Sequence, residues 1–301
     1  MPSRDTFDAF ASDEFLAGLG FGSAAFAIGV LVIYVWRQWR SDAVPIGGAL
    51  MTAAAAAGVQ GTFAPSTDLW VGIAMLVGAG ALYPWARRVP FLAAALAAPG
   101  AWWVTKVVDL PGADWVPWLL FGWIVVSAPL VSSLDRHFAD RGYGPILLLI
   151  AIAGMFTTLP DTEEILVVFG AALPLVLLAW PKPLASLGAA GVYPALGLLA
   201  WVIAVGGRGR ESAIVGAVAC LGLFILEPPI RWWRTRTLLD RIPAAWWGAP
   251  AMAVSQLVVV LLAARVAGLR ATAFQAAVVA LIVAGVTAAA IADRPVGRSA
   301  S

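Results

Sequence analysis

Long apolar stretches, separated by short polar ones, make up almost the whole chain between Phe15 and Ala292. About 20 apolar residues are needed to cross a hydrocarbon layer of roughly 30 Å, and most of these stretches approach that length. Charges, prolines and tryptophans bound eleven candidate spans, at residues 15–36, 44–63, 69–86, 90–105, 115–133, 144–159, 163–180, 184–206, 213–230, 244–264 and 272–292. The pattern predicts an all-α fold: a polytopic membrane bundle of about eleven transmembrane helices, with ten as the alternative, in which residues 1–301 form a single domain.

The charges beside the spans predict their orientation. The chain begins with acidic residues, whereas the first span ends at Arg37 and is followed by Arg40. If the eleven spans cross the membrane in alternating directions, most of the 19 lysine and arginine residues lie on the same side as Arg37. An excess of lysine and arginine is typical of cytoplasmic loops. If the weakest span, 90–105, does not cross the membrane, the lysines and arginines are no longer concentrated on one side. We therefore expect the N-terminus outside and the C-terminus in the cytoplasm.

Tryptophan supports the same boundaries, because indole prefers the headgroup layer of a membrane. Nearly all of the 15 tryptophans lie at or near a proposed span end. Trp123 and Trp201 lie deeper, and we expect them to pack inside the bundle or to line a cavity.

Composition excludes several classes of protein. With 61% hydrophobic and 12% charged residues, the chain has about half the charge of a soluble domain. Its basic residues are spread along short loops, so the net charge of +2 indicates topology rather than a nucleic-acid partner. Many arginines and alanines are typical of a GC-rich genome, so we expect the protein to lie in a bacterial inner (plasma) membrane. Its expected partners are membrane lipids, and other membrane proteins if it is an accessory subunit.

Catalytic motifs are missing from the sequence. His137 is the single histidine and Cys220 the single cysteine, which disfavours haem and zinc sites. A metal site at Asp135, His137 and Asp140 is disfavoured because arginines adjoin both carboxylates. Neither a Gly-x-Ser-x-Gly turn nor a P-loop occurs. We therefore expect no metal, no cofactor and no catalytic residue. A non-enzymatic function is favoured.

The densest polar feature lies between the spans 144–159 and 163–180, on the predicted outer side. Three carboxylates and three hydroxyls could bind a cation or a hydroxyl-rich substrate. Alternatively, Asp161 caps the next helix, because Asp161 and Glu164 have the spacing of a capping box and negative charge complements the helix dipole. The cap is the favoured interpretation. The candidate residues are Thr157, Thr158, Asp161, Glu163 and Glu164.

Glu227 is the second candidate, as the one carboxylate that this reading places within a span. Intramembrane carboxylates often mark ion or proton pathways, and Pro228 and Pro229 can leave carbonyl groups free. An interfacial Glu227 that is neutralised by Arg231 or Arg234 explains the sequence equally well. The basic and aromatic stretch that follows is a candidate for lipid or partner contact, although a topological anchor is favoured. It contains Arg231, Trp232, Trp233, Arg234 and Arg236.

Three functions remain open. Transport or flipping of a small or lipid-linked solute is the leading one, because prolines at residues 84, 99, 174 and 194 interrupt apolar stretches and loops are minimal. A non-catalytic accessory or scaffold subunit is the alternative, since so few charges lie inside the spans. The third is an enzyme that acts on a lipid-linked substrate at the outer membrane face through Asp161, Glu163 and Glu164.

Overall fold

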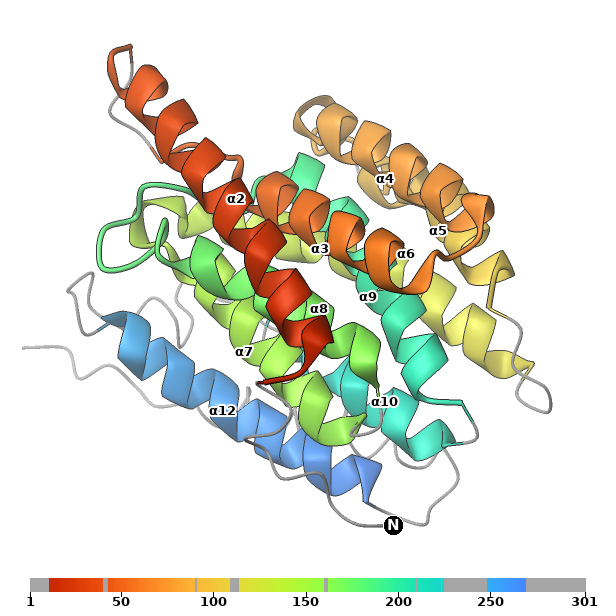
Figure 1. The fold of residues 1–301 in the computed structure, drawn as a ribbon. Coiled ribbons are helices and arrows are strands. Elements are labelled where there is room, and N and C mark those ends of the chain that lie inside the picture. The colour runs from red at the N-terminus through yellow and green to blue at the C-terminus, as the bar shows by residue number, and fades with distance from the viewer. Residues whose placement is uncertain are drawn as a thin grey trace, which may run out of the picture.

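The computed structural model describes residues 11–39, 43–89, 91–108, 114–159, 162–208, 210–222, 224 and 248–268. These residues form ten α-helices and one short 3-10 helix, and their only β-pairing is an isolated bridge (Figure 1). The predicted all-helical fold is confirmed. The elements are α2 (Asp13–Arg37), α3 (Gly47–Phe63), α4 (Thr67–Ala86), α5 (Leu92–Lys106), α6 (Trp115–His137), η1 (Ala139–Arg141), α7 (Tyr143–Thr158), α8 (Glu163–Val176), α9 (Ala189–Gly206), α10 (Glu211–Ala219) and α12 (Gly248–Ala267).

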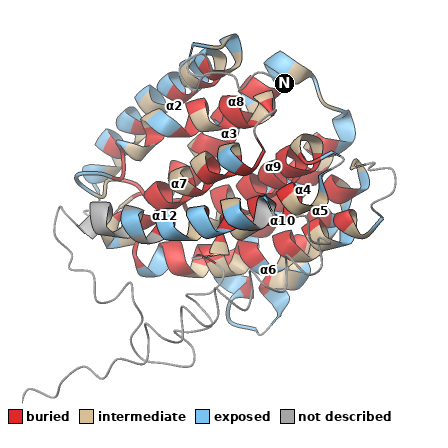
Figure 2. Ribbon diagram, turned by 90° about the horizontal axis from the view of Figure 1, so that it is seen from below, coloured by how far each residue is buried: buried red, intermediate tan, exposed pale blue. Residues whose placement is uncertain are grey.

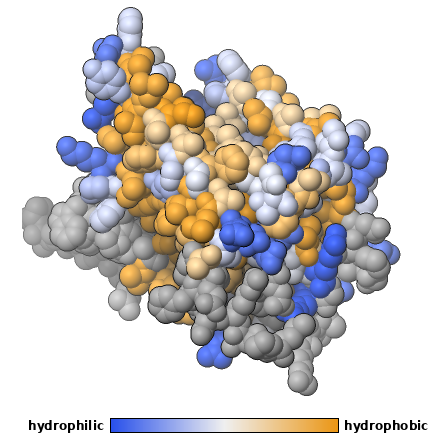
Figure 3. All heavy atoms as spheres, viewed as in Figure 1, coloured by the Kyte–Doolittle hydropathy of each residue, from blue (hydrophilic) through white to orange (hydrophobic). Residues whose placement is uncertain are grey.

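Four of these helices, namely α2, α4, α6 and α9, are long and apolar enough to cross a membrane. The helix α7 and the part of α12 from Gln256 to Arg265 are apolar but shorter. The surface agrees, because the coloured part of the face in Figure 3 has large apolar areas, with hydrophilic residues gathered in smaller patches. These observations indicate a membrane protein. The last predicted span, 272–292, lies outside the described residues.

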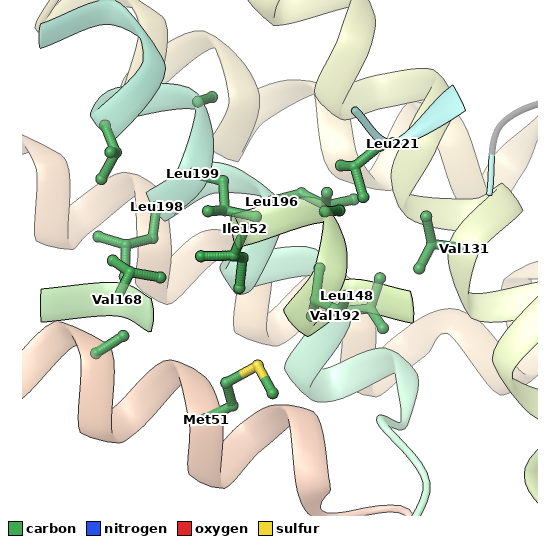
Figure 4. Close-up of a cluster of buried hydrophobic side chains, with 14 of the residues drawn as sticks. Met51, Val131, Leu148, Ile152, Val168, Val192, Leu196, Leu198, Leu199 and Leu221 are labelled. Atoms are coloured by element: carbon green, nitrogen blue, oxygen red, sulfur yellow. The ribbon is translucent and has the colours of Figure 1, made fainter. Parts of the chain in front are cut away.

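Helix α9 is the centre of the bundle. It is apolar on all sides, which is the pattern of a fully buried helix, and every residue from Gly191 to Ala204 is buried (Figure 2). It contacts α3, α4, α5, α6, α8 and α10. Figure 4 shows Leu198 and Leu199 of α9 beside Ile152 of α7. Trp201 is also buried, as the sequence predicted for this tryptophan.

Helix α2 lies at the periphery, against α3 and α8 (Figure 1). Its outward face exposes large apolar side chains, among them Leu31 at 64% and Tyr34 at 68% exposure. In a membrane such a face contacts lipid tails. The C-terminal end of α2 extends beyond its neighbours in Figure 1.

The connection between α8 and α9 differs from the prediction. The sequence pattern placed only three residues between these spans, whereas α8 ends at Val176 and α9 begins at Ala189. Residues 177–188 are irregular, yet Leu178, Ala185 and Leu187 are almost fully buried. Their apolar character reflects burial rather than helix, and Pro181 and Pro183 disfavour continuation of α8. With 14 residues, α8 is about 21 Å long, which is less than the hydrocarbon thickness.

Candidate functional site

The irregular segment before α9 pairs with the start of α3. The Val44 N–H donates to Leu184 O, and the Ser186 N–H donates back to Val44 O, both at 3.0 Å. The first two N–H groups of α3, at Gly47 and Gly48, donate to the oxygens of Ser186 and Leu187 at 2.8 Å. Helix ends leave such N–H groups without partners inside the helix. We call residues 44–48 and 184–188 the junction.

Asp135 joins α6 to the junction. Its carboxylate is 3% exposed and accepts two main-chain hydrogen bonds, from Leu187 N–H to Oδ1 and from Gly188 N–H to Oδ2, both at 2.9 Å. The sequence pattern predicted that this span ends at residue 133, before Asp135. That placement was wrong, because α6 continues to His137. Asp135 thus lies in the last turn of a helix that is long and apolar enough to cross a membrane, whereas Glu227, predicted as the one carboxylate within a span, lies outside the described residues.

The burial of Asp135 has an electrostatic explanation. An isolated buried carboxylate is costly unless it is hydrogen-bonded or paired. The two N–H donors immediately precede α9, so the carboxylate lies at the positive end of the α9 dipole. Charge-assisted bonds of this kind are among the stronger protein hydrogen bonds. Its neighbours Arg136 and His137 are both exposed.

Helices α3 and α9 touch at their backbones beside the junction. The Thr52 hydroxyl lies 2.8 Å from Gly48 O and 3.0 Å from Gly191 O, so its proton is shared between the two helices. A Cβ atom on Gly191 would overlap the main chain of Gly48. Gly188 has a φ of 70°, a conformation that glycine adopts without strain. The junction is therefore a fixed crossing of α3, α6 and α9.

Four buried polar side chains follow one another along α6, and we call them the polar row: Trp123, Ser127, Ser132 and Asp135. At about 100° per residue, Trp123 and Ser127 lie near one edge of the buried face of the helix, and Ser132 and Asp135 lie nearer the other edge. Trp123 Nε1, Ser127 Oγ and Ser132 Oγ are buried and have no hydrogen-bond partner. The row extends over about 18 Å of helix. Buried polar groups are normally bonded to protein or to ordered water, so these three groups have capacity for water or a polar ligand.

The two threonines of the predicted outer cluster do not converge on a common site. Thr157 is exposed and its hydroxyl lies 2.7 Å from Gly154 O. Thr158 is buried, with its hydroxyl 3.0 Å from Met155 O. Each hydroxyl therefore donates its proton within α7.

The acidic part of the outer cluster lies at the start of α8. Glu163 and Glu164 are partly exposed in its first turn, where negative charge complements the helix dipole, and Arg208 attracts the Glu164 carboxylate. The residue that precedes the helix is Thr162, not Asp161, and its side chain makes no capping bond. Thr162 Oγ1 is buried against Gly206 without a hydrogen-bond partner. Asp161 itself lies outside the described residues.

The other sequence candidates cannot be placed. Glu227 and the basic, aromatic stretch of Arg231, Trp232, Trp233, Arg234 and Arg236 lie outside the described residues. They remain predictions from the sequence.

Comparison with known proteins gives no family for this chain. No model of a known protein family matches it, and no curated protein is detectably similar to it.

Proposed function

We propose that this protein transports or flips a small or lipid-linked solute across a bacterial plasma membrane, along the polar row of α6. The observation that carries the proposal is the set of buried and unpartnered polar atoms on Trp123, Ser127 and Ser132. In a protein without a binding site, buried polar groups that lack a partner only lower the stability of the folded state. In a transporter they bind water or substrate for part of the cycle.

The connection between α8 and α9 supports the same function. Many transporters bind substrate where a helix is interrupted inside the membrane, because free main-chain groups become available there. Irregular backbone at that depth is tolerated only where protein buries it or water lines it. Part of the segment 177–188 meets this condition, since Leu178, Ala179 and residues 185–187 are buried, whereas residues 180–182 are exposed. In the proposed topology eleven helices cross the membrane, with the N-terminus outside and the C-terminus in the cytoplasm.

A second candidate function is that of an accessory subunit which binds another membrane protein. The exposed apolar face of α2, with Leu31 and Tyr34, favours this alternative as a contact surface. Lipid alone also satisfies such a face. An enzyme at the outer rim has less support, since Glu163 and Glu164 lie in the first turn of α8, where their negative charge already complements the helix dipole.

The test is alternating access of water to α6. Cysteines placed at Ser127 and Ser132 should react with a small charged thiol reagent in membrane vesicles, because a transport path fills with water in one of its states. Cys220 is fully buried, so the native chain provides an unreactive background. The matched control is Ala200→Cys in α9, which is also fully buried but is not one of the polar positions of α6.

Reaction at Ser127→Cys and Ser132→Cys, with Ala200→Cys unreactive, supports transport. If all three cysteines stay unreactive from both sides of the membrane, the bundle is closed and the accessory function is favoured. A parallel assay in liposomes should follow the exposure of a fluorescent phosphatidylglycerol to dithionite, and it distinguishes flipping of a lipid from transport of a soluble compound.

A further inference from the structure

Three aromatic side chains gather where α5 ends and α6 begins. The ring centroids of Trp102 in α5 and Trp118 in α6 lie 5.5 Å apart. The ring of Phe121 in α6 lies 6.4 Å from the Trp102 ring and 6.3 Å from the Trp118 ring. Trp102 is 47% exposed and Trp118 is 61% exposed, so both indoles present apolar surface to the outside of the bundle. We call these three residues the aromatic cluster.

A lysine lies one turn beyond the aromatic cluster. Lys106 follows Trp102 by four residues, so the two side chains share a face of α5. Lys106 is exposed, and its Nζ lies 5.3 Å from the centroid of the Trp103 ring, which is a cation–π contact. Among the described residues, no carboxylate forms an ion pair with this ammonium group. Its positive charge is therefore available to an anion from outside the chain.

On the other side of the aromatic cluster the surface is made of small residues. Pro99 lies one turn before Trp102 in α5, and Gly122 lies one turn after Trp118 in α6. Pro99 is exposed, and a Cβ atom added to Gly122 would have nothing within 4 Å. Both residues lie on the side of the cluster away from Lys106. We call this surface the open strip.

The order of these features along the helices matches the parts of a phospholipid. A positive charge complements a phosphate, indole rings prefer the headgroup layer, and the open strip offers apolar surface to an acyl chain. With 23 residues, α6 is about 34 Å long, which is slightly more than the hydrocarbon thickness. Both ends of α6 therefore lie near a membrane surface if it crosses, whichever way it runs.

We propose that Lys106, the aromatic cluster and the open strip bind one anionic phospholipid. The Lys106 ammonium group binds the phosphate, the indoles of Trp102 and Trp118 lie against the glycerol region, and an acyl chain covers Pro99 and Gly122.

The site selects against a choline headgroup, which would bring a second positive charge beside Lys106. The expected preference is about fivefold, from the contribution of one lysine beside an anionic lipid. This site goes beyond the proposed function, because an accessory subunit could bind the same lipid.

The test counts the lipids that stay on the purified full chain in native mass spectrometry. The protein in detergent is mixed with equal amounts of phosphatidylglycerol and phosphatidylcholine that carry the same acyl chains. The native chain should retain phosphatidylglycerol about fivefold more often. Lys106→Gln should lose this preference. Lys182→Gln is the matched control and should keep it, because Lys182, the other lysine of the sequence, is exposed on the connection between α8 and α9.

A second pair of variants tests the position of the acyl chain. Gly122→Leu fills the open strip and should reduce the binding of both lipids. Gly78→Leu in α4, where an added Cβ atom also meets nothing within 4 Å, should not.

Equal retention of the two lipids by the native chain, or a preference that Lys106→Gln keeps, overturns the proposal. Equal lipid binding by the Gly122→Leu and Gly78→Leu variants also overturns it. So does a dimer of the native chain that Gly122→Leu dissociates, since a second copy would then cover this surface.

Discussion

Asp135, in the last turn of α6, accepts a hydrogen bond of 2.9 Å from the N–H of Gly188, the residue immediately before α9. The second carboxylate oxygen accepts the N–H of Leu187 at the same distance. One side chain therefore holds the start of the most buried helix in the described bundle. Loss of this carboxylate should loosen α9 against α6 and α3 together.

Asp135→Ala should be strongly destabilising. Each buried N–H that loses its acceptor costs about 1 to 3 kcal/mol, so removal of the carboxylate should cost about 2 to 6 kcal/mol. Asp135→Asn should fall between Ala and the native chain, because asparagine keeps one acceptor oxygen but turns an NH₂ group towards the second N–H. The measurement is unfolding of the purified protein in detergent by heat or by denaturant.

The control for this prediction is Asp140→Ala, which changes an exposed aspartate five residues later in the same region. Its unfolding should match that of the native chain. Equal stability of the Asp135→Ala and Asp140→Ala variants would show that the two hydrogen bonds do not hold α9.

Gly191→Ala should separate α3 from α9. The added methyl group would overlap the main chain of Gly48, and overpacking of this kind costs about 1 to 3 kcal/mol. Gly78→Ala in α4 is the matched control, because nothing lies within 4 Å of its added methyl group. That change should leave stability unchanged or raise it by about 0.5 to 1 kcal/mol, through the higher helix propensity of alanine. Thermal unfolding of both variants provides the comparison.

Thr162→Val tests whether the outer cluster binds anything. Valine has nearly the same shape as threonine but lacks the buried hydroxyl, which has no hydrogen-bond partner. If that hydroxyl binds no ligand, the free energy of unfolding should rise by about 1 kcal/mol. Thr158→Val is the control, since its hydroxyl donates to Met155 O and its loss should cost about 0.5 to 1.5 kcal/mol. A Thr162→Val variant that is stable but impaired in liposome assays would instead make the cluster a binding site.

The proposed orientation predicts which loops react from outside the cell. A cysteine at Ser66, which is exposed between α3 and α4, should be labelled by a membrane-impermeant reagent in intact cells. A cysteine at Val89, which is 52% exposed between α4 and α5, should be labelled only after the membrane is opened. The reverse result would place the N-terminus in the cytoplasm.

Hydropathy alone predicts most of this fold. Each of the helices α2 to α10 and α12 overlaps a predicted span, and four of these described helices are long and apolar enough to cross a membrane, where main-chain polar groups must be satisfied within helices. The same reasoning failed for residues 177–188. Pairing with Val44 satisfies the main chain there, and no local pattern reveals a partner so distant in sequence.

The polar sites were harder to predict. Asp135 lies in a charged sequence with Arg136 and His137, which is typical of a loop, and only its contact with residues 187 and 188 shows its burial. Ser127 and Ser132 carry no charge and interrupt apolar runs without a recognisable motif.

The crossing of α3 and α9 also constrains how the protein is made. Thr52 bonds to the oxygen of Gly191, which lies 139 residues later in the chain. When α3 leaves the ribosome, the oxygens that its first turn requires have not yet been synthesised. Since chains emerge from the N-terminus at about 5 to 20 residues per second, α3 waits for several seconds or longer in the bilayer or beside the insertion machinery. Its early insertion therefore depends on lipid or on a chaperone, and the native crossing forms only after α9 has entered the membrane.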